Sequence, residues 1–122
     1  MNDIEMVQGI FPIIARRLPK KWQRVVFRTS YGDDAYSMEY YAQKAGGVFV
    51  QCFEIPGVRE DDLLNDFVAM DKIIEGYRHS LGTKDLWWRM TLVVNADGTF
   101  KVDYDYDQVE ETDDVWESKY LK

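Results

Sequence analysis

The 122-residue chain has few of the residues that build disulfides, membrane anchors and common catalytic sites. It contains one cysteine, Cys52, so it can form no internal disulfide, and one histidine, His79. No apolar run approaches the roughly 20 residues that span a bilayer. The first residues lack the basic start and apolar core of a secretory signal. We therefore expect a protein of the reducing cytoplasm that does not contact membranes.

Positive charge is also scarce. The chain has 15 Lys and Arg against 22 Asp and Glu, which gives a net charge of −7. Proteins that bind nucleic acid neutralise phosphates with basic side chains, so direct nucleic-acid binding is not expected. The acidic excess lies at the C-terminal end, where residues 97–122 carry nine acidic and three basic side chains. Such an end can keep a domain soluble or can bind a basic partner.

Motifs for catalysis and cofactors are missing as well. The sequence has no glycine-rich phosphate loop and no Cys/His spacing typical of zinc. His79 falls on the polar side of a predicted helix, and Cys52 falls in a predicted strand with no histidine close in sequence to activate it. We expect no enzyme activity and no cofactor.

A calcium loop is one alternative for the acidic C-terminal half. Asp103, Asp105 and Asp107 alternate as in such a loop, but the loop also needs glycine at its sixth position and glutamate at its twelfth. Those positions hold Gln108 and Asp114. The segment is therefore predicted to be a strand and not a metal site.

The chain has enough apolar residues, 46% of the total, to fold as one domain over residues 1–122. Two long helices are predicted from apolar residues at spacings of three and four. In the first, Pro12 is expected to kink or restart the helix and Pro19 to end it. The second begins near Glu60. The two apolar stripes are Ile4, Val7, Phe11, Ile14 and Leu18, and Leu63, Phe67, Met70, Ile74, Tyr77 and Leu81.

Five strands are predicted from alternating apolar residues and turn signals. They cover residues 22–29, 36–42 and 48–55, a segment that starts at Leu86, and residues 100–107, with a tight turn at 95–98. Residues 110–121 are expected to form a short amphipathic helix that docks on the body. The order α-β-β-β-α-β-β-α indicates an α+β fold: an antiparallel sheet of about five strands, with helices on one face and the other face partly open.

The last predicted strand carries the candidate partner-binding surface. Asp103, Asp105 and Asp107 share one face, about 6.6 to 6.8 Å apart, so their charges repel one another and gain from a cation brought to them. Glu110, Glu111, Asp113 and Asp114 follow behind them. Among the tryptophans, Trp88 alternates in phase with the apolar residues that follow it in the strand, which predicts a core position, whereas Trp87 shares a face with Arg89 and Thr91. Trp87 is therefore the candidate aromatic anchor.

The order and spacing of several segments resemble the YezG-like immunity proteins. These segments are Leu-Pro-Lys-Lys-Trp at residues 18–22, a tryptophan at 87 or 88 before residues 92–95, Asp-Gly-Thr-Phe-Lys-Val-Asp-Tyr-Asp-Tyr at 97–106, and Trp-Glu-Ser-Lys-Tyr-Leu at 116–121. The resemblance spans nearly the whole chain. It implies an antitoxin that binds the toxin domain of a secreted or contact-delivered bacterial protein, often a nuclease, and blocks it in the producing cell.

The acidic charge agrees with this function, because a nuclease cleft that holds phosphates is basic and carboxylates can occupy it. Two alternatives remain open from the residues alone. The chain could be an adaptor that binds a peptide or a second copy of itself through a sheet edge. A small hydrolase or metal enzyme is the more distant alternative.

Overall fold

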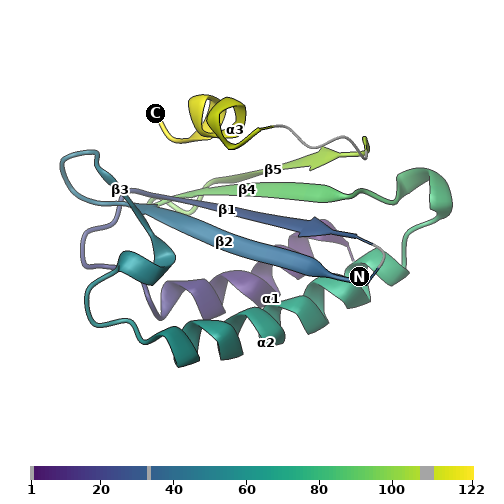
Figure 1. Ribbon diagram of the computed structural model, residues 1–122, viewed down its shortest axis with the longest axis horizontal. Coiled ribbons are helices and arrows are strands. Elements are labelled where there is room, and N and C mark those ends of the chain that lie inside the picture. The colour runs from purple at the N-terminus through teal and green to yellow at the C-terminus, as the bar shows by residue number, and fades with distance from the viewer. Residues whose placement is uncertain (1, 33, 108–111) are drawn as a thin grey trace.

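The computed structural model describes residues 2–32, 34–107 and 112–122, and its central element is an antiparallel sheet between two layers of helix (Figure 1). The observed order of elements is α-β-β-β-α-β-β-α, as predicted, so the α+β class is confirmed. The helices are α1 (Asp3–Ala15), α2 (Glu60–His79) and α3 (Asp113–Tyr120). The strands are β1 (Arg24–Tyr31), β2 (Tyr36–Gln43), β3 (Phe49–Gln51), β4 (Arg89–Asn95) and β5 (Phe100–Asp105).

The strand order in the sheet is β3-β2-β1-β4-β5, and every neighbouring pair is antiparallel. The meander β1-β2-β3 forms one half. After α2 crosses below the sheet, the hairpin β4-β5 joins the free side of β1. β1 is therefore central, while β3 and β5 form the two edges.

Helices α1 and α2 cover one face of the sheet, where the main core lies (Figure 1). The predicted stripe of α2 is buried from Leu63 to Tyr77. In α1 the buried residues are Met6, Val7, Ile10 and Ile14, whereas Ile4 in the first turn is 52% exposed. No helix in the described ranges is long and apolar enough to cross a membrane.

Helix α1 runs through Pro12 as one element from Asp3 to Ala15, so the helix does not restart there. Proline removes the hydrogen bond to the carbonyl four residues earlier, here that of Gln8. Gln8 and Pro12 are both exposed, so water can bond the freed carbonyl. The helix ends at Ala15, four residues before Pro19.

The third and fifth strands are shorter than predicted. β3 ends at Gln51, whose side chain accepts a hydrogen bond of 2.8 Å from the Phe53 amide and turns the backbone into a 3-10 helix over Cys52–Glu54. Cys52 is thus a buried turn residue and not part of a strand. β5 ends at Asp105, so Asp107 lies beyond its pairing with β4.

A buried carboxylate joins the two long helices. Asp66 on α2 is 4% exposed and accepts hydrogen bonds from Arg16 (3.0 Å) and Arg17 (2.8 Å), at the C-terminal end of α1. A second bond from the Arg17 guanidinium, of 3.1 Å, makes that contact bidentate. The helix pair is therefore fixed by charge as well as by apolar contact.

We expect Asp66→Asn to lower the free energy of unfolding by about 2 kcal/mol, because charge-assisted hydrogen bonds contribute about 1.5 to 3 kcal/mol. Arg16 is 59% exposed and can be rehydrated, which limits the loss. Urea unfolding should show a lower midpoint with an unchanged slope. Asn65→Ala, at the exposed neighbouring position, is the control and should stay within about 0.5 kcal/mol of the parent. Equal stability of the two variants would contradict this account.

Candidate functional site

Helix α3 lies on the face of the sheet opposite α1 and α2 (Figure 1). The two long helices thus share one face of the sheet, as predicted, and the short C-terminal helix docks on part of the other face. The N-terminus of α3 is capped by Thr112, whose hydroxyl accepts a hydrogen bond of 3.4 Å from the Val115 amide. One α3 side chain, Trp116, is buried, with 5% exposure. The short helix is therefore held mainly by its side-chain contacts with the sheet.

The register of the strands arranges the α3 side of the sheet in three rows, because residues paired across strands point to the same face. The upper row is Ser37, Ser30, Arg89 and Asp105; the middle row is Glu39, Arg28, Thr91 and Asp103; the lower row is Tyr41, Val26, Val93 and Lys101. Each row takes one residue from β2, β1, β4 and β5 in that order. Positive and negative side chains are thus neighbours within the upper and middle rows.

Within the described residues, contacts of Trp116, Tyr120 and Arg28 attach α3 to the middle and lower rows. The indole nitrogen of Trp116 donates a hydrogen bond of 3.0 Å to the Thr91 hydroxyl, and its ring lies 5.9 Å from that of Tyr41. The Tyr120 hydroxyl donates one of 2.8 Å to Asp103. The third contact is made by Arg28.

Arg28 connects β1 to both β2 and α3. Its guanidinium forms ion pairs with Glu39 and with Asp113 (3.0 Å), and its central carbon lies 4.1 Å from the centre of the Trp116 ring. Burial alone would lower the pKa of Arg28, but the charges of Glu39 and Asp113 outweigh it and raise the pKa. Arg28 therefore stays charged and holds α3 in place.

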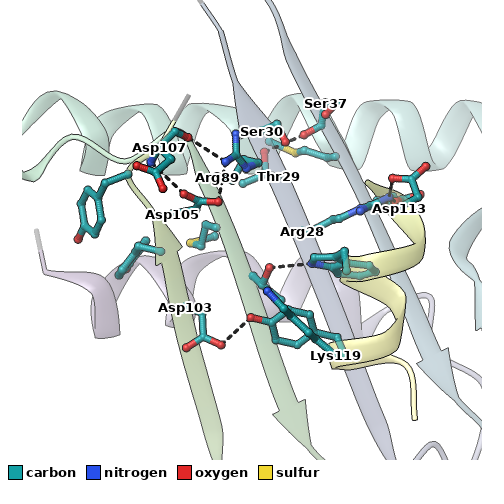
Figure 2. A pocket seen from close by; sticks show the side chains of 18 residues that line it. Arg28, Thr29, Ser30, Ser37, Arg89, Asp103, Asp105, Asp107, Asp113 and Lys119 are labelled. Atoms are coloured by element: carbon teal, nitrogen blue, oxygen red, sulfur yellow. Dashed lines mark hydrogen bonds and ion pairs between the residues drawn. The ribbon is translucent and has the colours of Figure 1, made fainter. Parts of the chain in front are cut away.

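The upper row forms part of a groove of about 870 Å³ beside α3 (Figure 2). Asp113, Trp116, Lys119 and Tyr120 line the groove from α3, and Tyr106 and Asp107 line it from the end of the hairpin. The described part of the chain thus offers a concave surface that includes the predicted acidic strand.

Inside the groove, Arg89 compensates part of the negative charge. Its guanidinium donates to Asp105 (2.5 Å) and to the backbone carbonyl of Asp107 (2.8 Å), and the Asp107 amide donates to Asp105 (2.9 Å). Burial alone would raise the pKa of Asp105, but these two donors outweigh it and hold the pKa below its usual value. Asp105 is therefore an ionised carboxylate that already has a cation.

This pairing corrects the expectation of three uncompensated carboxylates that repel one another. The sequence places Arg89 on another strand, so its position opposite Asp105 follows only from the register. Lys101, two residues from Asp103 on the same face, adds an ion pair of 3.6 Å. The carboxylates available to a partner are consequently those toward the rim of the groove.

The predicted acidic residues divide into three groups. Asp103, Asp105, Asp107 and Asp113 line the groove, and Asp114 is exposed on the first turn of α3. Glu110 and Glu111 lie outside the described residues. The structure therefore brings four of the predicted carboxylates together around one hollow.

Trp87 does not belong to this surface, so its prediction as an exposed anchor is wrong. It is 1% exposed, its ring stacks on Tyr104 at 5.4 Å, and Trp88 is the half-buried member of the pair. The Trp88 amide donates a hydrogen bond to the Asp105 carbonyl. In the register of β4 and β5, however, the residue opposite Asp105 is Arg89. Two residues thus face one, as at a β-bulge, and the alternation shifts by one position before β4.

Neither Cys52 nor His79 lines the groove. Cys52 is fully buried, and burial raises the pKa of its thiol to about 11, so the thiol is protonated at neutral pH. The His79 side chain is 77% exposed and lies 3.0 Å from Glu75 on the same helix. Within residues 2–32, 34–107 and 112–122, no group of three or more His, Cys, Asp or Glu side chains is arranged to hold a metal ion.

Among known protein families, the sequence matches the one described as "Immunity protein YezG-like" over residues 4–121. No curated protein matches the chain. The family match covers nearly the whole chain and confirms the resemblance found in its motifs.

We expect Trp116→Ala to detach α3 without unfolding the sheet. Removing a buried tryptophan costs about 3 kcal/mol or more, and here it also removes the bond to Thr91 and the ring beneath Arg28. Amide hydrogen exchange should show loss of protection in α3, while β1 and β4 keep theirs. Val115→Ala, at a position 44% exposed, should leave α3 protected. Retained protection in the Trp116 variant would show that other contacts hold the helix.

Proposed function

Because the chain belongs to the YezG-like immunity protein family, we propose that it is an antitoxin that binds a cognate bacterial toxin domain and neutralises it. The inhibition is stoichiometric, requires no catalysis by this chain, and takes place in the cytoplasm of the producing cell. The observation that carries this proposal is the family match over residues 4–121. The groove beside α3 supplies a surface on which such a partner can bind.

We further propose that the toxin is a nuclease whose basic active cleft receives the acidic side of this protein. A nuclease must hold a polyanion, so its cleft carries cations, and carboxylates can stand where phosphates would bind. The net charge of −7 and the exposed carboxylates of Asp107 and Asp114 support this choice. Asp103 and Asp105 support it less directly, because Tyr120 and Arg89 already bond them.

The charge has a kinetic consequence. Complementary potentials can raise association rate constants to about 10⁸ to 10⁹ M⁻¹s⁻¹ at low salt. Screening shortens the range of this attraction to about 8 Å at physiological ionic strength. Fast capture suits an antitoxin, because a toxin that remains free continues to damage the cell.

Co-expression tests the proposed function directly. The toxin domain is sought as the basic C-terminal domain of the reading frame next to this gene, and is expressed in a bacterial host with or without this chain. We expect growth arrest by the domain alone, growth with this chain, and co-purification at a one-to-one ratio. The isolated domain should cut DNA or RNA, and the added chain should stop the cutting. Growth arrest that persists with soluble, folded chain present would refute the antitoxin function.

Rim carboxylates should control the association rate. We expect the double variant Asp107→Asn/Asp114→Asn to slow association with the toxin domain roughly three- to tenfold at low salt, with little change at high salt. The matched control is Glu60→Gln/Asp61→Asn, which makes the same charge change at exposed positions on α2. Stopped-flow measurement should show less than a twofold change for the control. Equal slowing by the two double variants would remove the groove side as the steering surface.

A further inference from the structure

The groove beside α3 differs from a flat acidic surface in its shape. Its floor is the upper row of the sheet, and its sides are α3 and the residues Tyr106 and Asp107 at the end of the hairpin (Figure 2). A volume of about 870 Å³ is within the range of pockets that enclose a ligand of several groups. A segment that projects from a partner can therefore enter the groove, whereas a broad flat surface would contact only its rim.

The charges of the groove favour a cation at its mouth. Five carboxylates line it, those of Glu39, Asp103, Asp105, Asp107 and Asp113, against three cations, Arg28, Arg89 and Lys119. Arg28 and Arg89 are 23% and 17% exposed, and each pairs with carboxylates of the groove itself. In the described part of the chain the carboxylate of Asp107 has no hydrogen-bond or ion-pair partner. Negative charge is thus left over where a partner enters.

Hydroxyl groups occupy the other end of the floor. Ser30 and Ser37 lie directly opposite each other on β1 and β2, and Ser30 is paired on its other side with Arg89. Within the described residues neither hydroxyl has a hydrogen-bond partner, and both side chains line the groove (Figure 2). Serine leaves space for an incoming group and can donate or accept a hydrogen bond.

We propose that this groove is a socket for a projecting loop of the partner protein, with an arginine at the loop tip. The guanidinium bonds the carboxylate of Asp107, and the polar groups of the loop tip bond the hydroxyls of Ser30 and Ser37. Arginine suits this position because its planar group bonds a carboxylate with two parallel hydrogen bonds, and because it is enriched among residues that dominate binding energy. The exposed ring of Tyr106 offers an apolar contact beside the guanidinium.

This inference rests on the proposed function only for the identity of the partner. It makes Ser30 and Ser37 specificity-determining residues, since their small size keeps the socket open. A partner held only by phosphate mimicry would depend on charge at the rim and not on the space between β1, β2 and α3. The two modes of binding therefore respond differently to an uncharged, bulky side chain.

The first experiment uses a capped peptide, acetyl-Gly-Arg-Tyr-Gly-amide, and the ¹⁵N-labelled full chain. We expect amide shift changes concentrated at Ser30, Ser37, Arg89 and the residues around Asp107, with none for the matched peptide that carries glutamate in place of arginine. Ser37→Tyr should reduce the changes at least fivefold because the larger ring fills the socket. Asp107→Asn should do so without adding bulk. Asn65→Tyr, exposed on α2, is the control for the added ring and should bind as the parent does.

Shift changes spread over acidic residues of α2, or full binding by Ser37→Tyr and Asp107→Asn with intact amide spectra, would overturn the socket. A second arm uses the toxin domain that the co-expression experiment identifies. There Ser37→Tyr should weaken affinity at least tenfold while Asn65→Tyr has no effect. Neutralisation that tolerates Ser37→Tyr would refute the socket and leave the antitoxin function intact. Peptide binding in the groove without any toxin neutralisation would refute the function and leave the socket intact.

Discussion

The guanidinium of Arg28 is the interaction on which the α3 side of the sheet depends. It belongs to the central strand, pairs with Glu39 on β2 and Asp113 on α3, and lies over the ring of Trp116. Two carboxylates and an aromatic face share a single cation, which is why a helix of eight residues can stay on the sheet with one buried side chain. The position of α3 in turn decides which row of the sheet is covered and which stays open.

The same pairing changes the meaning of the chain's acidity. The net charge alone suggests a strongly anionic surface. On this face, however, Arg28 on β1 and Arg89 on β4 form ion pairs with carboxylates and neutralise part of the negative charge. Internal pairs of this kind hold carboxylates in fixed places and keep them ionised, as at Asp105. Long-range attraction then comes from the rim, and the interior of the groove contributes shape and hydrogen bonding. In the proposed binding mode Asp107 serves both steering and recognition, Asp114 serves steering, and Ser30 and Ser37 serve recognition.

Local patterns in the sequence were sufficient for the layers of the fold. The α2 stripe from Leu63 to Tyr77 is buried as predicted, because helical spacing and core contact have the same period. The turn at residues 95–98 leads into β5 where expected, since the glycine there has φ of 91° and favours a tight reversal. These features depend on neighbours within about four residues.

Features that depend on partners distant in sequence could not be predicted in the same way. The rows that bring Arg28 to Glu39 and Arg89 to Asp105 follow from strand register, and no local motif identifies that register. The sequence pattern placed Trp87 on the wrong face of the sheet. Trp88 and Arg89 both lie opposite Asp105, and the extra residue shifts the alternation of side chains between the two faces. Pro12 was expected to kink or restart α1, and the helix continues through it, because the sequence does not show whether water reaches the carbonyl that proline leaves unpaired. Each error arose where tertiary context overrode a local rule.

The sheet separates two tasks by its faces. One face packs against α1 and α2 and contains nearly all of the apolar core, while the other carries α3 and the groove. Because side chains alternate along each strand, a codon change at a position of the upper or middle row alters a residue that does not point into that core. If the proposed antitoxin function holds, a lineage can therefore diversify the α3 face to follow a changing toxin, while the helical layer continues to maintain the fold.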